Sequence, residues 1–385
     1  MTKGTFPVER FKSIETPFYY YDVDLLKETL DKMKDQTHKY GYHQHYAVKA
    51  NANHKILQII AAAGFGADCV SGNEVKAAIS AGFPCSKIVF AGVGKTDKEI
   101  NLALDYNIFC FNVESLPELE VINELAEKKG KKASVAIRIN PNVDAHTHEY
   151  ITTGLNENKF GFSMSSLDKV FDKIKTFENI ELIGIHFHIG SQITEVETFE
   201  PLCKRVNELQ SQCEAKGIQL KNINVGGGLG IDYDDPNTNP IADFGPYFEV
   251  FHKHLELRKG QILHFELGRA VVAQCGSLIS RVTYVKEGDS KKFVILDAGM
   301  TDLIRPALYQ AYHKIENISS DLPIAKYDVV GPICESSDCF VKDYDLNETK
   351  RGDFVALRSA GAYGEIMASQ YNCREIPKAY LSDKL

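Results

Sequence analysis

The sequence lacks several features that mark other classes of protein. Its nine cysteines include no C-x-x-C pair, which favours a reducing compartment over a disulfide framework. No apolar run approaches the roughly 20 residues needed to cross a bilayer, and the opening MTKGTFPVERF has no apolar segment typical of a secretory signal. The net charge of −8 disfavours a sequence-independent nucleic-acid binder. We therefore expect a cytoplasmic protein that binds neither membranes nor nucleic acid.

Low-complexity stretches and repeats of fixed period are also missing. The 385 residues, 44% of them hydrophobic, suffice for two domains or for one large barrel with an appendage. Eight short apolar runs alternate with segments whose apolar residues recur every three or four positions. Eight strands, each followed by a helix, predict a parallel (β/α)8 barrel of the TIM type. The predicted strands are 46–50, 67–71, 88–92, 108–113, 135–140, 182–189, 223–227 and 262–267.

The pattern changes after Arg269. Short runs rich in Val and Ile are separated by Gly-Asp turn signals, with little room for crossover helices. They predict an all-β C-terminal domain with strands at 271–273, 278–285, 292–296, 328–330 and 353–357. The aromatic segment Pro17–Asp22 is expected to pair with that domain. The predicted division is a barrel over 25–268 and a β domain formed by 1–24 and 269–385.

In a barrel of this kind, active residues come from the carboxyl ends of the strands. The first strand ends in YAVKAN, where Lys49 closes an apolar run. Poor hydration there favours the neutral amine that a Schiff base requires, and the alternative is a lysine that reaches solvent. Glycine turns follow the seventh and eighth strands, where this fold binds phosphate. These glycines are Gly226, Gly227, Gly228 and Gly268, for which plain turns are the alternative.

The sixth strand ends in HFHIGSQ, and strand alternation puts His186 and His188 on one face. No cysteine or carboxylate follows at a metal-like spacing, so we expect no metal site. A pocket imidazole that stacks on a flat ligand is the better interpretation, with a satisfied core histidine as the alternative.

Glu266 closes the eighth strand, where a buried carboxylate needs a proton or a cation as its partner. A pyridinium N–H would supply both the proton and the positive charge. A pyridoxal ring that is protonated at this nitrogen acts as an electron sink. The alternative partner is Arg138 or Arg269, through a salt bridge inside the barrel.

The β domain contributes a second set of candidates. Arg305 offers the planar fork that matches a substrate carboxylate, with the Tyr309 hydroxyl nearby. In GPICESSD, the thiol of Cys334 is a candidate acid beside Glu335, which could clamp a substrate ammonium. In AGAYG, small residues flank Tyr363, which could reach a phosphate. Each of these, taken alone, is typical of an ordinary loop.

Taken in order, these residues resemble the fold-type III pyridoxal-phosphate decarboxylases, and within them the members that act on meso-2,6-diaminopimelate. The similarity extends over nearly the whole chain. It is carried by YAVKAN, GADCVSGNE, TGLNENKFGF, HFHIGSQ, GGGLGIDY, DAGMTDLIRPALYQAYH, GPICESSD and AGAYG. It implies pyridoxal 5'-phosphate as the cofactor, with L-lysine and CO2 as products. One departure is Leu267, where the family usually has a proline; leucine restores an N–H donor and allows more backbone freedom.

The resemblance implies a role for each candidate. Lys49 would bind the cofactor as a Schiff base, His188 would stack on its ring, and Glu266 would bind the pyridine nitrogen with Asp68 nearby. The phosphate would be surrounded by Ser191, Gly226, Gly227, Gly228, Gly268, Arg269 and Tyr363. The far end of the substrate would be held by Arg269, Arg305, Tyr309, Glu335 and Tyr363. Cys334 and Glu335 would come from the other subunit of a homodimer, and Cys334 would return the proton after CO2 leaves.

Related activities remain open at this point. Ornithine- or arginine-type decarboxylases and carboxynorspermidine decarboxylase share the cofactor site. A substrate that ends in a bare amine needs an acidic clamp, whereas a second carboxylate needs an arginine. Alanine racemases place an arginine at the pyridine nitrogen, and Glu266 argues against them. A non-catalytic regulatory homologue would be expected to lack Lys49 or Cys334, and both are present.

Overall fold

The computed structural model describes residues 6–143 and 159–385, which fold into two compact units. The barrel unit comprises Leu30–Gly230 and Asp243–Gly268. The β unit comprises the described chain up to Thr29, together with Ile231–Ala242 and Arg269–Leu385. The short segment at Ile231–Ala242 therefore leaves the barrel unit and returns to it. Of the motif TGLNENKFGF, residues 153–158 lie outside the described part of the chain.

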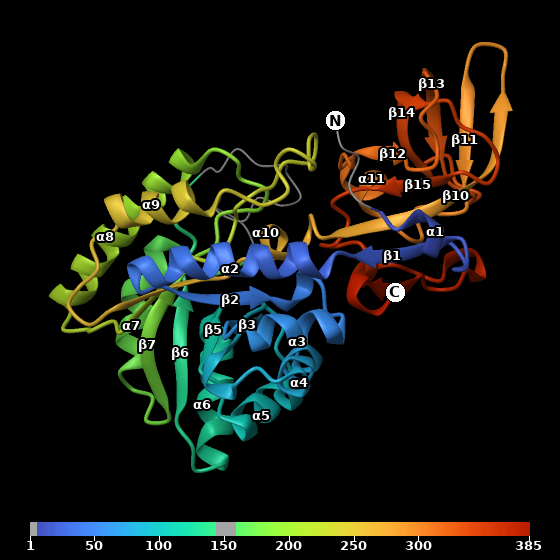
Figure 1. The fold of residues 1–385 in the computed structure, drawn as a ribbon. Coiled ribbons are helices and arrows are strands. Elements are labelled where there is room, and N and C mark those ends of the chain that lie inside the picture. Colours follow the sequence, from blue (N-terminus) through green and yellow to red (C-terminus); the bar gives the residue numbers. More distant parts are fainter. Residues whose placement is uncertain (1–5, 144–158) are drawn as a thin grey trace. The chain divides into compact units, whose positions relative to one another are not determined.

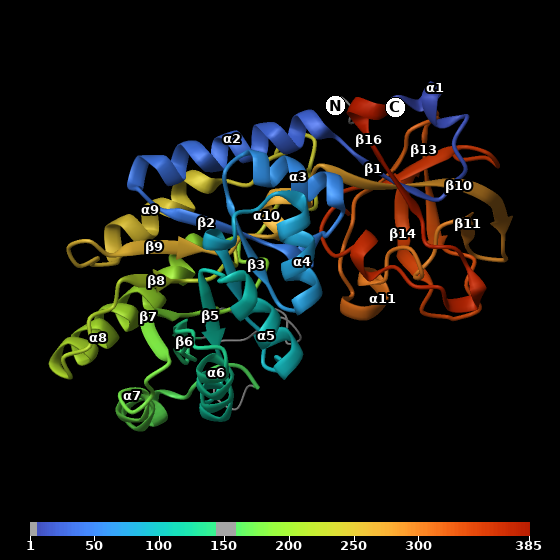
Figure 2. The same cartoon turned by 90° about the horizontal axis from the view of Figure 1, so that it is seen from below.

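A closed parallel barrel of eight strands, β2 to β9 in chain order, forms the barrel unit, and the (β/α)8 prediction is confirmed. Its strands are β2 (His43–Ala47), β3 (Gly66–Cys69), β4 (Ile88–Phe90), β5 (Cys110–Val113), β6 (Ala133–Arg138), β7 (Ile180–His186), β8 (Asn222–Asn224) and β9 (Ile262–Phe265). Helices lie outside the strands in Figure 2. They are α2 (Val23–Tyr40), α3 (His54–Ala62), α4 (Gly72–Ala81), α5 (Asp97–Tyr106), α6 (Leu116–Lys128), α7 (Leu167–Ile174), α8 (Glu200–Ala215) and α9 (Phe244–His254). Strands covered on both faces need apolar side chains throughout, which explains the continuous runs in the sequence.

Local capping signals set where several barrel helices begin. The Ser71 side chain accepts a hydrogen bond from the Glu74 amide at the start of α4. Thr96 and Glu99 form a reciprocal capping box at the start of α5. These side chains satisfy amides that the first helical turn leaves without partners. Helix α4 ends at Gly82, whose φ of 101° is a left-handed conformation that favours glycine.

The β unit is built on one eight-stranded sheet; most of its strands are labelled in Figure 1, and β16 is labelled in Figure 2. The main order is β12-β15-β10-β11-β13-β14, with β1 on β10 and β16 on β1. These strands are β1 (Phe18–Tyr21), β10 (Gly276–Glu287), β11 (Lys292–Leu296), β12 (Ile315–Asn317), β13 (Ile324–Val330), β14 (Cys339–Asn347), β15 (Phe354–Leu357) and β16 (Lys378–Leu381). The expected pairing of Pro17–Asp22 with this unit is confirmed, because β1 runs antiparallel to β10. A core cluster beneath it includes Phe11, Phe18, Tyr20 and Phe354.

One predicted strand of the β unit is wrong. Residues 271–273 belong largely to a short helix, α10 (Arg269–Val272), whose residues are all buried. A three-residue apolar run cannot be told from a buried helical turn by periodicity alone. Two further short helices, α1 (Val8–Phe11) and α11 (Arg305–Tyr309), also interrupt the unit.

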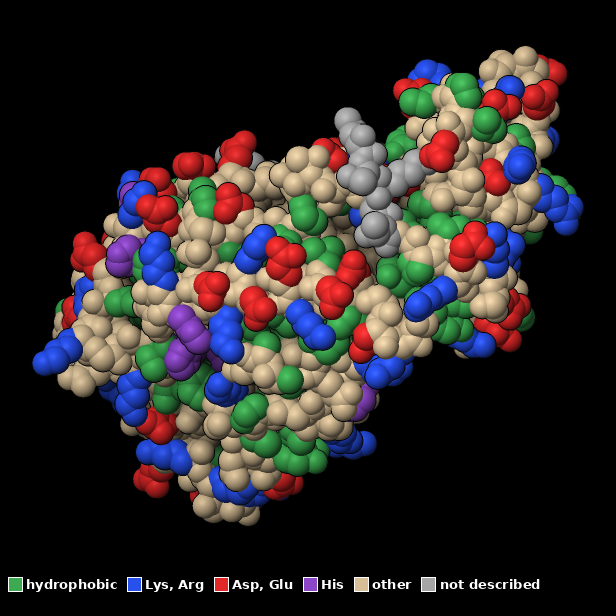
Figure 3. Space-filling model, in the orientation of Figure 1, with side chains coloured by type: hydrophobic (Ala, Val, Ile, Leu, Met, Phe, Trp, Pro, Cys, Tyr) green, Lys and Arg blue, Asp and Glu red, His purple; other side chains and the backbone are tan. Residues whose placement is uncertain are grey.

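The surface carries mixed charge. On the face drawn in Figure 3, lysine and arginine side chains alternate with aspartate and glutamate rather than gathering in one zone. Among the helices in the described ranges, none combines the length and apolar character that a membrane span requires.

A pair of buried histidines crosses the barrel interior. Nε2 of His45 in β2 lies 2.9 Å from Nδ1 of His264 in β9, and the other nitrogens contact the Lys87 carbonyl (3.0 Å) and Asn222 Oδ1 (2.9 Å). Each histidine is only 3% exposed. Burial lowers the pKa of His45 to about 4, and burial together with His45 lowers that of His264 well below its usual range. Both rings are therefore neutral in the folded protein near neutral pH.

We predict that this pair makes the protein acid-sensitive. The folded pKa lies below the unfolded value, so its contribution to stability is complete above about pH 6.5 and declines as the pH falls toward 4. Between pH 7.5 and pH 5, His45 alone should lower the free energy of unfolding by about 2 kcal/mol. Urea denaturation followed by circular dichroism at both pH values should show this loss in the wild type and a correspondingly smaller one in His45→Gln. The exposed His38→Gln in α2 is the control, and equal losses in the wild type and His45→Gln would contradict the prediction.

Candidate active site

The predicted site residues divide between the two units. Those in the barrel unit lie at or after the carboxyl ends of its strands: Lys49, Asp68, His188, Ser191, Gly226, Gly227, Gly228, Glu266 and Gly268. Those in the β unit are Arg269, Arg305, Tyr309, Cys334, Glu335 and Tyr363. Each unit thus carries its own group of polar side chains.

Inside the barrel, side chains from three other strands hold the carboxylate of Glu266. Oε1 accepts hydrogen bonds from the side-chain amides of Asn112 (3.0 Å) and Asn224 (2.7 Å). Oε2 accepts one from Nε2 of His186 (2.9 Å). Asn112 lies in β5, while Asn224 and His186 end β8 and β7. A carboxylate has about four acceptor positions, so Glu266 can still receive another donor.

The arrangement keeps Glu266 ionised. Burial raises its pKa, but the attraction of His186, the hydrogen bond from that ring and the amide of Asn224 outweigh burial and lower the pKa overall. Arg138 pairs with Glu114 at 2.7 Å, and Arg269 bonds to a tyrosine of the β unit. The alternative in which Arg138 neutralises Glu266 is therefore wrong. The negative charge of Glu266, just after β9, can therefore pair with a cationic hydrogen-bond donor of a ligand.

The two histidines after β7 have different surroundings. Strand β7 ends at His186, two residues before His188, and the shared face of the two histidines stays a prediction. His188 Nδ1 lies 3.4 Å from the amide of Gly227. Burial, followed by the positive charge of Lys49 and Arg138, lowers the pKa of His188 well below its usual range, so this imidazole is neutral. Within the described residues, no group of three or more His, Cys, Asp or Glu side chains is placed to hold a metal ion.

Lys49 follows β2, and Asp68 is the third of the four residues of the neighbouring strand β3. Lys49 lies in a single turn of 3-10 helix, Val48–Ala50, and is exposed, so the expected poor hydration of this lysine is wrong. Asp68 is 3% exposed, and its Oδ1 has no hydrogen-bond partner within the described chain. Burial and then Glu266 raise the pKa of Asp68, while Lys49 opposes them. An accessible amine therefore stands near two buried carboxyl groups.

The glycines after β8 are required by close backbone packing. A Cβ on Gly227 would lie 2.3 Å from the carbonyl oxygen of Glu266, and one on Gly226 would lie 2.4 Å from that of Phe187. Gly226 and Gly228 also have φ values of 71° and 115°, which favour glycine. Gly268 is similarly tight, since its Cβ would lie 3.0 Å from the Cβ of Ala47. Close packing against neighbouring backbone is therefore sufficient to require these glycines, as in the plain-turn alternative.

In the β unit, two arginines converge on one tyrosine. Nη1 of Arg269 and Nη1 of Arg305 lie 2.7 Å and 3.0 Å from the hydroxyl of Tyr233. The Arg269 guanidinium also lies 5.0 Å from the ring centre of Tyr363. Arg305 begins α11, and Tyr309, half-buried, ends it. The guanidinium groups of Arg269 and Arg305 therefore lie close together in a buried part of the β unit.

The loop 331–338 holds Cys334 and Glu335, which are both exposed. Buried Asp338 shapes this loop, because its two carboxylate oxygens accept the amides of Met300 and Ile333, each at 2.6 Å. The hydroxyl of Tyr371 donates to Glu335 at 2.6 Å. The thiol and the carboxylate are therefore held by a rigid loop yet remain accessible.

Known proteins share both the sequence and the fold. Residues 24–273 match the family described as "Pyridoxal-dependent decarboxylase, pyridoxal binding domain". A diaminopimelate decarboxylase of Bacteroides thetaiotaomicron is 65% identical over 384 residues, which is 100% of each chain. The chain belongs to the diaminopimelate decarboxylase family.

Solved structures agree with this membership. The crystal structure of diaminopimelate decarboxylase from Helicobacter pylori complexed with L-lysine has a TM-score of 0.91 at 42% identity, covering 97% of this chain and 93% of that one. The enzyme from M. jannaschii in co-complex with L-lysine has a TM-score of 0.90 at 35% identity, covering 99% and 91%. Both likenesses include the barrel and the β unit, because they extend over nearly the whole chain.

The cofactor of this family is pyridoxal 5'-phosphate, and the barrel residues fit it. The ionised Glu266 carboxylate has spare acceptor capacity for a protonated ring nitrogen. Oδ1 of Asp68, which has no hydrogen-bond partner among the described residues, can accept a bond from a further donor. The exposed amine of Lys49 can react with an aldehyde.

Sequence reasoning did not find the residues that hold these groups. Asn112 and Asn224 are not among the predicted site residues, His186 is predicted only as one of a histidine pair at the end of the sixth strand, and Tyr233 has no predicted role. A signal existed for the asparagines, because a buried amide at the end of an apolar strand must find a partner. The identity of that partner depends on which strand ends meet across the closed barrel.

We predict that Asn112→Ala weakens cofactor binding, because the side chain of Asn112 donates to Glu266 from inside the barrel. Loss of one hydrogen bond to a charged group should raise the dissociation constant for pyridoxal 5'-phosphate about tenfold or more. Titration of cofactor-free protein, followed by visible absorbance, measures the change. Asn222→Ala in β8, whose Oδ1 contacts His264 rather than Glu266, is the matched control. Wild-type affinity in Asn112→Ala would show that this donor is dispensable.

Proposed function

We propose that this chain decarboxylates meso-2,6-diaminopimelate to L-lysine and CO2 with pyridoxal 5'-phosphate. The observation that carries the proposal is the 65% identity, over the whole length, to a named diaminopimelate decarboxylase. Relatives from H. pylori and M. jannaschii were solved with L-lysine, the product of this reaction. The ionised carboxylate of Glu266 supports the same chemistry.

When bound, the cofactor supplies a sink for the electron pair that departing CO2 leaves behind. We assign Lys49 to attach it through the ε-amine and Glu266 to hold a proton at the ring nitrogen. The neutral imidazole of His188 is assigned to the ring face, with Asp68 nearby. The phosphate is assigned to Ser191, Gly226, Gly227, Gly228, Gly268, Arg269 and Tyr363.

Substrate recognition is assigned to the β unit, with the residues Arg269, Arg305, Tyr309, Glu335 and Tyr363. The guanidinium forks of Arg269 and Arg305 suit the carboxylate at the non-reacting end of the substrate. Glu335 suits the ammonium group beside that carboxylate. This combination favours diaminopimelate over ornithine and arginine, because the far ends of those substrates carry only a cation.

We further propose that the active form is a homodimer in which Cys334 and Glu335 complete the site of the second subunit. Cys334 is assigned to return a proton to the reacting carbon after CO2 leaves. The exposure of both side chains supports this assignment, since a residue that enters another subunit's site must be accessible. A cytoplasmic location is proposed because all nine cysteines are free thiols, as a reducing compartment requires.

The substrate assignment is tested by measuring CO2 release from meso-diaminopimelate, ornithine, arginine and L-lysine in parallel. We expect the first to be preferred at least about a thousandfold, because a buried arginine pair left without its carboxylate penalises the others. Lys49→Ala should abolish release, whereas Lys55→Ala, exposed in α3, should not. Comparable rates of CO2 release from ornithine, or activity retained in Lys49→Ala, would contradict the proposal.

The shared site is tested by mixing two inactive chains, Lys49→Ala and Cys334→Ala. After subunit exchange, half of the dimers are mixed and each has one intact site, so about a quarter of wild-type activity should return. A mixture of Lys49→Ala with the Lys49→Ala, Cys334→Ala double variant cannot form an intact site and is the control. No rescue, when size-exclusion chromatography of tagged chains shows mixed dimers, would count against shared sites.

A further inference from the structure

Tyr233 accepts hydrogen bonds from two cations that would otherwise repel each other. Its hydroxyl lies 2.7 Å from Nη1 of Arg269 and 3.0 Å from Nη1 of Arg305. The three residues are only 9%, 7% and 6% exposed, so solvent screens the repulsion poorly. Burial raises the pKa of Tyr233, but the two guanidinium groups outweigh burial and lower it overall. The phenol oxygen is therefore the common acceptor of both arginines.

The same nitrogen of Arg305 also contacts a second neutral acceptor, His313. Nη1 of Arg305 lies 2.8 Å from Nε2 of His313, whose Nδ1 lies 2.8 Å from the carbonyl of Arg358. Burial, then the charge of Arg305, lowers the pKa of His313 to about 3, so the ring is neutral, with its hydrogen on Nδ1. Arg305 forms no ion pair with a carboxylate anywhere in the described ranges. A buried guanidinium held only by neutral groups still requires an anion.

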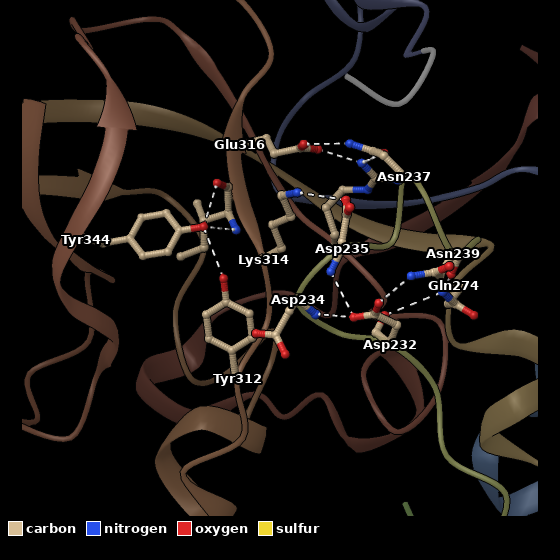
Figure 4. A network of polar contacts seen from close by, with 12 residues as sticks. Asp232, Asp234, Asp235, Asn237, Asn239, Gln274, Tyr312, Lys314, Glu316 and Tyr344 are labelled. Carbon is tan, nitrogen blue, oxygen red and sulfur yellow. Dashed lines mark hydrogen bonds and ion pairs between the residues drawn. The ribbon is translucent and has the colours of Figure 1, made fainter. Parts of the chain in front are cut away.

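The segment that carries Tyr233 is fixed on both sides of the tyrosine (Figure 4). Asp232 closes the turn, since its Oδ1 accepts the amides of Asp234 (2.8 Å) and Asp235 (2.9 Å) and its Oδ2 accepts from Asn239 (2.8 Å). Lys314 pairs with Asp235 at 3.4 Å, which ties the segment to the chain just before β12. Asn237 continues the attachment by donating to Glu316 in β12 at 3.0 Å. Tyr233 is thus presented by a clamped turn rather than by a loose loop.

We propose that Tyr233 is a positioning residue of the substrate site: it holds Arg269 and Arg305 together so that both recognise the carboxylate at the non-reacting end of the substrate. A carboxylate in its place would hold the arginines equally well but would cancel their charge and compete with the substrate. A phenylalanine would leave two cations without a common acceptor. A phenol holds both and leaves more of the charge for the incoming anion. This inference rests on the proposed function.

The test separates carboxylate recognition from the rest of substrate binding. In cofactor-loaded Tyr233→Phe, KM for meso-diaminopimelate should rise about tenfold to thirtyfold with kcat changed less than about threefold, because ground-state and transition-state binding weaken equally. The inhibition constant of L-lysine should rise in parallel, while that of cadaverine, which is L-lysine without its carboxylate, should not. Cofactor absorbance should be unchanged. Tyr312→Phe, which removes the hydroxyl of a neighbouring tyrosine in the β unit that contacts Tyr344, is the control.

Three results would overturn the inference: an unchanged KM in Tyr233→Phe, a fall in kcat alone, or equal weakening of L-lysine and cadaverine. If Tyr233→Phe does not fold, Asp232→Ala is the second test. Loss of the hydrogen bonds that Asp232 makes in this turn should raise the inhibition constant of L-lysine but not that of cadaverine, by a smaller factor than in Tyr233→Phe. Failure of the proposed function is distinguishable, because a wild type that releases no CO2 from diaminopimelate can still be compared with the variants by calorimetry of L-lysine and cadaverine binding.

Discussion

The carboxylate of Glu266, buried yet ionised, is the constraint on which the barrel site depends. Two asparagine amides and one histidine hold it without the full positive charge of an arginine. These donors come from β5, β7 and β8, so the carboxylate can be held this way only after the sheet has closed. The register that pairs His186 with Asn224 places two of the donors side by side. Closure of the barrel therefore creates the electrostatic environment that an electron-withdrawing cofactor requires.

The β unit holds buried cations with neutral partners, as the barrel holds a buried anion. Arg269 and Arg305 are buried cations held by neutral acceptors, Tyr233 and His313. In both units a charged group is fixed in place while much of its charge remains available to a ligand. A direct salt bridge would stabilise each group more simply, but it would remove the charge that recognition uses.

Within the barrel, stability and chemistry occupy different layers. His264 and Glu266 lie two residues apart, one in β9 and the other just after it, yet their surroundings differ. His45, in the middle of β2, and His264, the third residue of β9, form a neutral pair that a proton would disrupt. At the carboxyl ends, the ionised carboxylate of Glu266, the buried carboxyl group of Asp68 and the exposed amine of Lys49 form a polar group that a ligand would complete.

The sequence by itself determined the barrel, the β-rich second unit and the residue types of the site, because apolar periodicity and strand-end positions are local properties. It could not determine the partners of Glu266, since contacts across a barrel depend on closure and register. It also misjudged the hydration of Lys49, because the 3-10 turn after β2 exposes that side chain. The run at 271–273 became helix for a similar reason: three apolar residues suit either structure until packing decides. The meeting of Tyr233 with two arginines was likewise decided only by tertiary structure, because these residues lie far apart in the chain.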